Sequence, residues 1–162
     1  IIMKIVDVVR YILKVYPHAK ELSKARLNKI IYLIDWKSAL EHDKQLTNID
    51  WKFNHYGPYV NIIEESILND NRFNIRSTTN IYGNEKNIIE IKDDRDFMEP
   101  TEKDQEIIDF VIEKTRKFYW DKFINLVYST YPIISQVKGS QLNLVELAKE
   151  YKKIKQNDGD ES

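Results

Sequence analysis

The residue types that perform chemistry in proteins are scarce in this chain, and their spacing favours no catalytic or metal centre. The sequence of 162 residues has no cysteine, which removes thiolate nucleophiles and cysteine metal ligands. No histidine has a second histidine about three to five residues away, the spacing of many zinc sites; the three are His18, His42 and His55. The four glycines are scattered and form no phosphate-binding loop. We therefore predict no catalytic residue, no metal, no cofactor and no enzyme, although a Ser-His-Asp triad could still assemble across a fold.

Aromatic residues are the main candidates for recognition chemistry. The chain has ten tyrosines and three tryptophans. Large aromatic side chains fill protein cores, but Tyr and Trp also dominate interface affinity because they are large, rigid and amphipathic. A short segment carries four candidates together: Trp51, His55, Tyr56 and Tyr59. We predict a partner-binding surface there, with burial of these rings in the core as the alternative.

Hydrophobic spacing predicts the elements that precede this segment. Apolar residues between 5 and 13 recur at intervals of three and four, which predicts an amphipathic helix that Pro17 ends. Ser23 is a candidate N-cap for a second helix over 24–41. That helix has two apolar stripes: Leu27, Ile30, Ile31 and Ile34, and then Leu33, Trp36 and Leu40. A helix that is apolar on two sides is packed from both, so we expect it to be the spine of the fold.

A strand, a turn, a third helix and a hairpin are predicted next. Apolar and polar residues alternate from 49 to 53, the period of a half-buried strand. Gly57 suits the turn if its φ is positive, and Pro58 suits the first position of the third helix. Residues 73–92 alternate around the turn-forming pair Gly83-Asn84, which predicts a hairpin.

Three more helices follow an acidic connector. Their start signals are the capping boxes Thr101–Asp104 and Asn143–Glu146 and a candidate cap at Asp121, and Pro132 is expected to end the middle helix. The fold class predicted is mainly α (α+β): about six helices, a short strand and a small hairpin. We expect one domain over residues 3–155 and a flexible polar tail over 156–162. No apolar run approaches the ~20 residues that span a bilayer, so no membrane partner is expected.

Charge is nearly balanced over the chain but uneven along it. The formal net charge is -1, which gives no bulk attraction to nucleic acid. Residues 1–40 nevertheless hold eight Lys or Arg against three acids, a difference of five positive charges. A solvated helix face explains this excess, and a surface for nucleic acid or an acidic partner is the alternative.

Ordered motifs along the chain resemble the Panacea domain family, the SocA-like antitoxin domain. The resemblance covers roughly residues 3–152. The first matching motif lies in the second predicted helix, where Leu27, Lys29, Tyr32 and Trp36 match a family element. The motifs continue through the pair Leu46 and Thr47, then Trp51, then the tripeptide Tyr56-Gly57-Pro58, and end in a segment with Tyr128 and Pro132.

This resemblance implies an antitoxin of a bacterial or prophage toxin–antitoxin system. Such a domain neutralises its toxin by direct protein–protein contact, and the toxin would be the product of the adjacent gene. We therefore expect a cytoplasmic protein-binding module. The alternatives are a proteolytic adaptor that delivers the partner to a protease, and a DNA-binding regulator of a mobile element. The toxin, its contact surface and the oligomeric state are left open.

Overall fold

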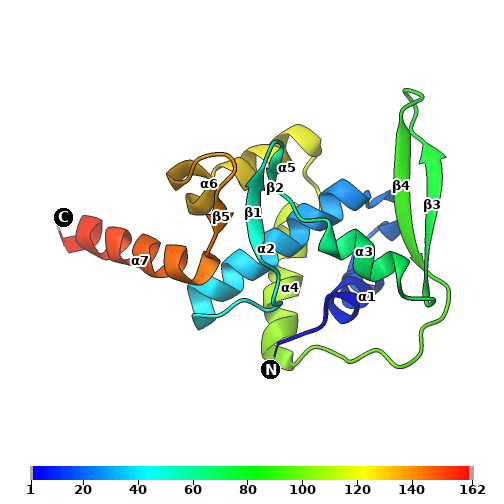
Figure 1. Cartoon of the computed structure of the whole chain (residues 1–162), viewed down its shortest axis with the longest axis horizontal. Coiled ribbons are helices and arrows are strands. Elements are labelled where there is room, and N and C mark those ends of the chain that lie inside the picture. The colour runs from blue at the N-terminus through cyan, green and yellow to red at the C-terminus, as the bar shows by residue number, and fades with distance from the viewer. Residues whose placement is uncertain (1, 161–162) are drawn as a thin grey trace.

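The computed structural model of this chain describes residues 2–160 and confirms a mainly helical α+β fold (Figure 1). Its elements are α1 (Ile5–Val15), η1, a 3₁₀ helix (Ala19–Glu21), α2 (Lys24–His42), β1 (Trp51–Asn54), β2 (Gly57–Pro58), α3 (Ile62–Leu68), β3 (Phe73–Thr79), β4 (Glu85–Ile91), α4 (Glu102–Thr115), α5 (Trp120–Tyr128), α6 (Tyr131–Ser135), β5 (Gln141–Leu142) and α7 (Leu144–Asp160). The described part therefore has seven α-helices where the sequence predicted about six. The short helix α6 is the one that was missed.

Helix α2 is the spine of the molecule, as predicted. It crosses the centre of the fold and packs against α4 and α7 (Figure 1). The Ser23 hydroxyl accepts a hydrogen bond of 3.2 Å from the Arg26 amide, which confirms the predicted N-cap. All side chains of the two predicted stripes are buried except that of Leu40, which is partly buried, because neighbouring helices cover the helix from two directions. This helix is therefore a rigid base for any side chain that it presents at the surface.

A small antiparallel sheet in the order β2-β1-β5 lies beside α2. Trp51 pairs with Leu142, and Phe53 pairs with Pro58. The prediction that Pro58 begins the third helix is wrong. Pro58 belongs to the edge strand β2, where a missing N–H is tolerated, and α3 begins at Ile62.

The predicted hairpin is present as β3 and β4, paired antiparallel from Phe73 opposite Ile91 to Thr79 opposite Glu85. Its turn includes Gly83, whose φ is +79°. The hairpin projects from the helical body in Figure 1, and Tyr82 at its tip is 81% exposed. The tip therefore offers an exposed aromatic residue away from the strand β1 and helix α5.

The acidic connector between β4 and α4 is held on α1 by buried charged residues. The Arg10 guanidinium donates to Asp94, at 2.8 Å from Nε, and to Glu99. The Asp7 carboxylate accepts a hydrogen bond of 3.0 Å from the Met98 amide. Part of the positive charge in residues 1–40 is thus neutralised by carboxylates within the fold.

The C-terminal helices differ from their predicted boundaries. Helix α5 has Tyr119 as its N-cap residue, and Asp121 lies in its first turn. Pro132 does not end that helix; it lies at the start of α6, where proline is favoured. Asn143 accepts a hydrogen bond from the Glu146 amide at 3.2 Å, so the predicted cap of the last helix is confirmed.

Helix α7 includes residues 156–160, part of the predicted tail, and residues 161 and 162 lie outside the described residues. The flexibility of this tail stays a prediction. No helix within residues 2–160 is long and apolar enough to cross a membrane.

Candidate partner-binding site

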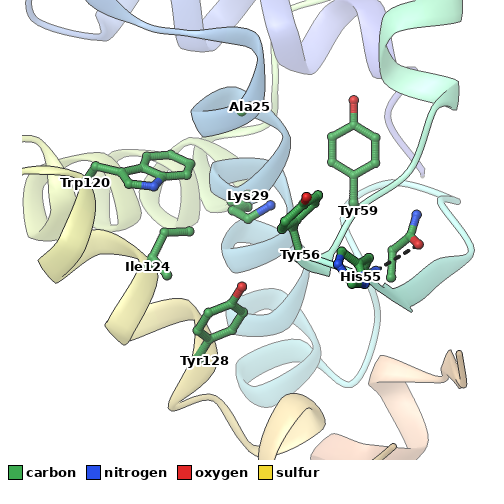
Figure 2. A pocket seen from close by; sticks show the side chains of 9 residues that line it. Ala25, Lys29, His55, Tyr56, Tyr59, Trp120, Ile124 and Tyr128 are labelled. Carbon is green, nitrogen blue, oxygen red and sulfur yellow. Dashed lines mark hydrogen bonds between the residues drawn. The ribbon is translucent and has the colours of Figure 1, made fainter. Parts of the chain in front are cut away.

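A pocket of about 480 Å³ lies between the N-terminal half of α2, the β1–β2 turn and α5. Figure 2 shows it from close by, with α2 behind and the α5 side chains facing the turn. Most of its lining side chains are aromatic or apolar. Three segments that are far apart in the sequence therefore meet at one concave surface.

Helical periodicity explains two sides of this pocket. Ala25 and Lys29 are four residues apart, so they lie on one face of α2. Trp120, Ile124 and Tyr128 follow the same spacing along α5. Phe123 and Val127 on the opposite stripe of α5 are buried and anchor that helix on the core. The amphipathic pattern of α5 thus turns a second, largely exposed stripe toward the pocket.

The β1–β2 turn supplies the third side. His55 and Tyr56 form the turn between the paired residues Asn54 and Gly57. The Asn54 side chain accepts a hydrogen bond of 2.9 Å from the His55 amide (Figure 2), and the His55 and Tyr56 rings meet edge to face at 4.6 Å. Tyr56 is 74% exposed, and Tyr59 follows directly after β2. Three of the four predicted binding residues are therefore brought together.

Close packing of Gly57 sets the distance between this turn and α5. Gly57 has φ +95°, a conformation that side chains disfavour. A Cβ at this position would lie 2.6 Å from Cε1 of Tyr128. Only glycine leaves the ring of Tyr128 in place against the strand, so this residue determines the shape of the pocket rim.

Lys29 provides the cation of the pocket. The residue is 3% exposed, and Figure 2 shows its amine directed toward Tyr56. Burial lowers the pKa of the Lys29 ammonium. Among the described residues, no carboxylate forms an ion pair with it and no acceptor forms a hydrogen bond with it. Its Nζ lies over the Tyr59 ring, 5.5 Å from the ring centre.

Trp51 does not belong to this surface, which corrects the prediction for that residue. It is 1% exposed, and its indole Nε1 donates a hydrogen bond of 2.8 Å to Asp35. The same carboxylate accepts hydrogen bonds from the amides of Leu46 and Thr47, at 3.0 and 2.9 Å, and from the Thr47 hydroxyl, at 2.6 Å. Trp51 is thus part of a buried polar network that ties the loop after α2 to the spine.

Most of the other predicted motif residues lie in the core. The Tyr32 hydroxyl shares a hydrogen bond of 2.8 Å with the Thr130 hydroxyl, and the Trp36 ring packs edge to face on Tyr151 at 6.1 Å. Three further residues are buried: Leu27, Leu46 and Pro132. Only Lys29, Tyr56 and Tyr128 among the motif residues line the pocket. The motif therefore contains both core and pocket residues.

The sequence reasoning missed three important residues. Trp120 and Ile124 line the pocket from α5, and Asp35 organises the buried network. The spacing of Trp120, Ile124 and Tyr128, opposite a buried stripe, is the signal that could have found the first two. A lone Asp between the apolar stripes of a spine helix is the signal for Asp35, since buried carboxylates require donors.

A second hollow of about 430 Å³ lies between α2, α4 and α5. It is apolar, and two cations on its rim already have partners. Lys37 forms an ion pair of 2.5 Å with Glu41 and lies 3.7 Å from the Phe110 ring, which Lys114 also approaches at 5.7 Å. Within residues 2–160, no group of three or more His, Asp or Glu side chains could hold a metal ion.

Comparison with known proteins points to one family. The family model described as "Antitoxin SocA-like, Panacea domain" matches residues 27–132, which include most of the spine helix, the β1–β2 turn and α5. No curated protein and no solved structure matches the chain. The matched segment is about two thirds of the chain and holds every residue of the pocket except Ala25. The chain therefore belongs to the SocA-like antitoxin family that is defined by the Panacea domain.

Proposed function

We propose that this chain is an antitoxin that neutralises a toxin by direct protein–protein contact, and that the pocket between α2, α5 and the β1–β2 turn is its contact surface. Membership of the antitoxin family supports the general role. The observation that carries the proposal is the gathering of aromatic side chains at one concave surface, among them the exposed Tyr56, Trp120 and Tyr128.

The chemistry of these side chains suits a protein partner. Interface hot spots are rich in Tyr and Trp and lie in pockets that can exclude water. Solitary exposed aromatics are normal on a protein surface, but a group of them around a hollow is a feature of binding sites. Close packing of Gly57 on Tyr128 keeps the rim in place before binding, which lowers the entropy lost on association.

DNA binding has weaker support. Four of the cations in residues 1–40 are in ion pairs within the chain: Arg10, Lys14, Lys24 and Lys37. Arg26 donates to the Thr115 carbonyl and lies over the Phe123 ring, at 4.3 Å. Four of the eight cations in this segment are therefore paired with carboxylates, which leaves less free positive charge for phosphate binding.

Co-expression with the neighbouring gene's product tests this function. We expect the neighbour alone to arrest bacterial growth, and the wild-type chain to restore growth and to co-purify with it. The variant Tyr56→Ala should weaken both effects, whereas Tyr82→Ala at the hairpin tip should weaken neither, because it removes an equally exposed tyrosine far from the pocket. Rescue without a stable complex would instead favour a proteolytic adaptor, and a harmless neighbour that does not co-purify would contradict the proposal.

A further inference from the structure

Lys29 is an ammonium group without a counter-charge. Its residue is almost fully buried, and no carboxylate or hydrogen-bond acceptor of the described residues meets its Nζ. Nζ keeps contact with the pocket, but enclosing a charge without a partner is unfavourable, because most of its hydration is lost. The stem is enclosed by α2 and its neighbours, while the amine is directed into the pocket (Figure 2). A counter-charge for Lys29 can therefore reach its amine through the pocket.

The surroundings of Lys29 indicate the kind of anion. Lys29 is the only Lys or Arg that lines the pocket, and no Asp or Glu lines it. Phosphate groups and nucleic acids are usually held by several cations or by clustered backbone amides, and such a set is not found here. Lys24, five residues earlier on α2, is neutralised by Glu64 at 2.9 Å. One cation among aromatic walls matches one carboxylate with apolar neighbours.

We propose that Lys29 pairs with the carboxylate of an Asp or Glu side chain of the toxin, and that an apolar side chain beside this acid packs between Tyr56, Trp120 and Tyr128. This inference rests on the proposed function and names the chemistry of its site. The aromatic rims would exclude water around the pair, as they do around the central residues of strong interfaces. A charge pair that forms only on binding also makes the site selective for acidic partners.

The second hollow provides the contrast that singles out Lys29. Lys37 also lies on α2 beside a hollow, but Glu41 already neutralises it and the Phe110 ring covers it. A toxin carboxylate would have to displace Glu41 in order to reach Lys37. The same substitution can therefore be made at both lysines of α2. It should weaken binding at Lys29 and leave binding unchanged at Lys37.

The test compares variants in the complex of the full chain with the neighbouring gene's product. Lys29→Met keeps the length of the side chain and removes the charge, and we expect the Kd to rise by at least about 30-fold. Lys29→Arg keeps the charge and should lose less affinity. Lys37→Met is the matched control and should bind within about threefold of the wild type. The melting temperature of free Lys29→Met should be no lower than that of the wild type, which separates lost pairing from lost folding.

Exchange of charge identifies the partner group. Each Asp and Glu of the toxin is changed to Lys, and one of these toxin variants should fail to bind the wild type and recover binding to Lys29→Glu. If Lys29→Met binds as the wild type does, the inference is overturned while the antitoxin function stands. The side-chain assignment is overturned if no single Asp or Glu substitution in the toxin abolishes binding but an extension of the toxin C-terminus does. If the wild type forms no complex, the proposed function and the inference fail together.

Discussion

Gly57 and Tyr128 are in such close contact that a Cβ on Gly57 would lie 2.6 Å from Cε1 of the tyrosine ring. Gly57 is the residue where the β1–β2 turn enters its second strand, and Tyr128 is the last residue of α5. This contact joins two of the three segments that form the pocket. The shape of the site thus depends on a residue that has no side chain.

Replacement of Gly57 by valine should destabilise the chain by about 3 kcal/mol, since the φ of +95° and the contact with Tyr128 both oppose a side chain. Gly83→Val is the matched control. Its φ is +79° but nothing lies within 4 Å of the added Cβ, so it should cost about 1–2 kcal/mol from backbone strain alone. Urea unfolding of both variants measures the difference. Equal losses at the two sites would show that the contact with Tyr128 contributes nothing.

Asp35 should make stability depend on pH in an unusual direction. Burial raises the pKa of Asp35 from 3.8 to about 6, and the hydrogen bonds from Thr47, Trp51 and Leu46 offset only part of this effect. The native state therefore binds the proton more tightly than the unfolded chain between these two values. The contribution of Asp35 to stability falls as the pH rises through this window, and a change from pH 7 to pH 5 adds about 1 kcal/mol to the wild type.

Comparison with Asp35→Asn isolates this contribution, because exposed carboxylates such as Asp43 and Asp93 titrate in both proteins. The variant should be less stable at pH 7, since an amide offers one oxygen to several donors. The gap in unfolding free energy should widen by about 1 kcal/mol at pH 5. A gap that is constant between pH 7 and pH 5 would mean that Asp35 titrates in the ordinary range.

Trp51→Phe should separate folding from binding. The change removes the indole donor to Asp35, a hydrogen bond to a charged group that is worth about 2 kcal/mol. The buried position predicts lower stability with an unchanged Kd for the toxin under conditions where both proteins are folded. Denaturant unfolding and calorimetric titration provide the two values. If the folded Trp51→Phe variant bound the toxin much more weakly than the wild type, Trp51 would have to be part of the contact surface.

Lys29→Met should make the free chain more stable, by about 1 kcal/mol, because it replaces an unpaired buried cation with an apolar side chain of similar length. Lys37→Met removes an exposed ion pair with Glu41 and should change stability by less than about 0.5 kcal/mol. Thermal unfolding of the two variants and the wild type shows whether their stabilities follow this order. A destabilised Lys29→Met would indicate that the lysine stabilises the free fold.

Local signals in the sequence predicted the main helices and the hairpin well. Ser23 caps α2, Asn143 caps α7, and the alternation around Gly83 marks β3 and β4, because each of these signals acts over a few residues. Pro58 and Pro132 were misplaced for the opposite reason. Proline is compatible with an edge strand, a helix start and a helix end, and only the pairing of β2 with β1 and the separate start of α6 decide between them.

The candidate site was predicted in part. His55, Tyr56 and Tyr59 are close together in the sequence, so their grouping was visible. Trp120 lies more than 60 residues later. Local spacing places it on one stripe of α5 with Ile124 and Tyr128, but only the packing of α5 turns that stripe toward the β1–β2 turn. The burial of Trp51 depends in the same way on Asp35, which lies in a different element.

Calorimetric titration of the neighbouring gene's product into the purified chain tests the central claim most directly. The wild type and Tyr82→Ala should bind with the same Kd, and Tyr56→Ala should bind at least about tenfold more weakly, because it truncates an exposed aromatic of the pocket without touching the core. The same Kd for all three proteins would contradict the claim that this pocket is where the antitoxin holds its toxin.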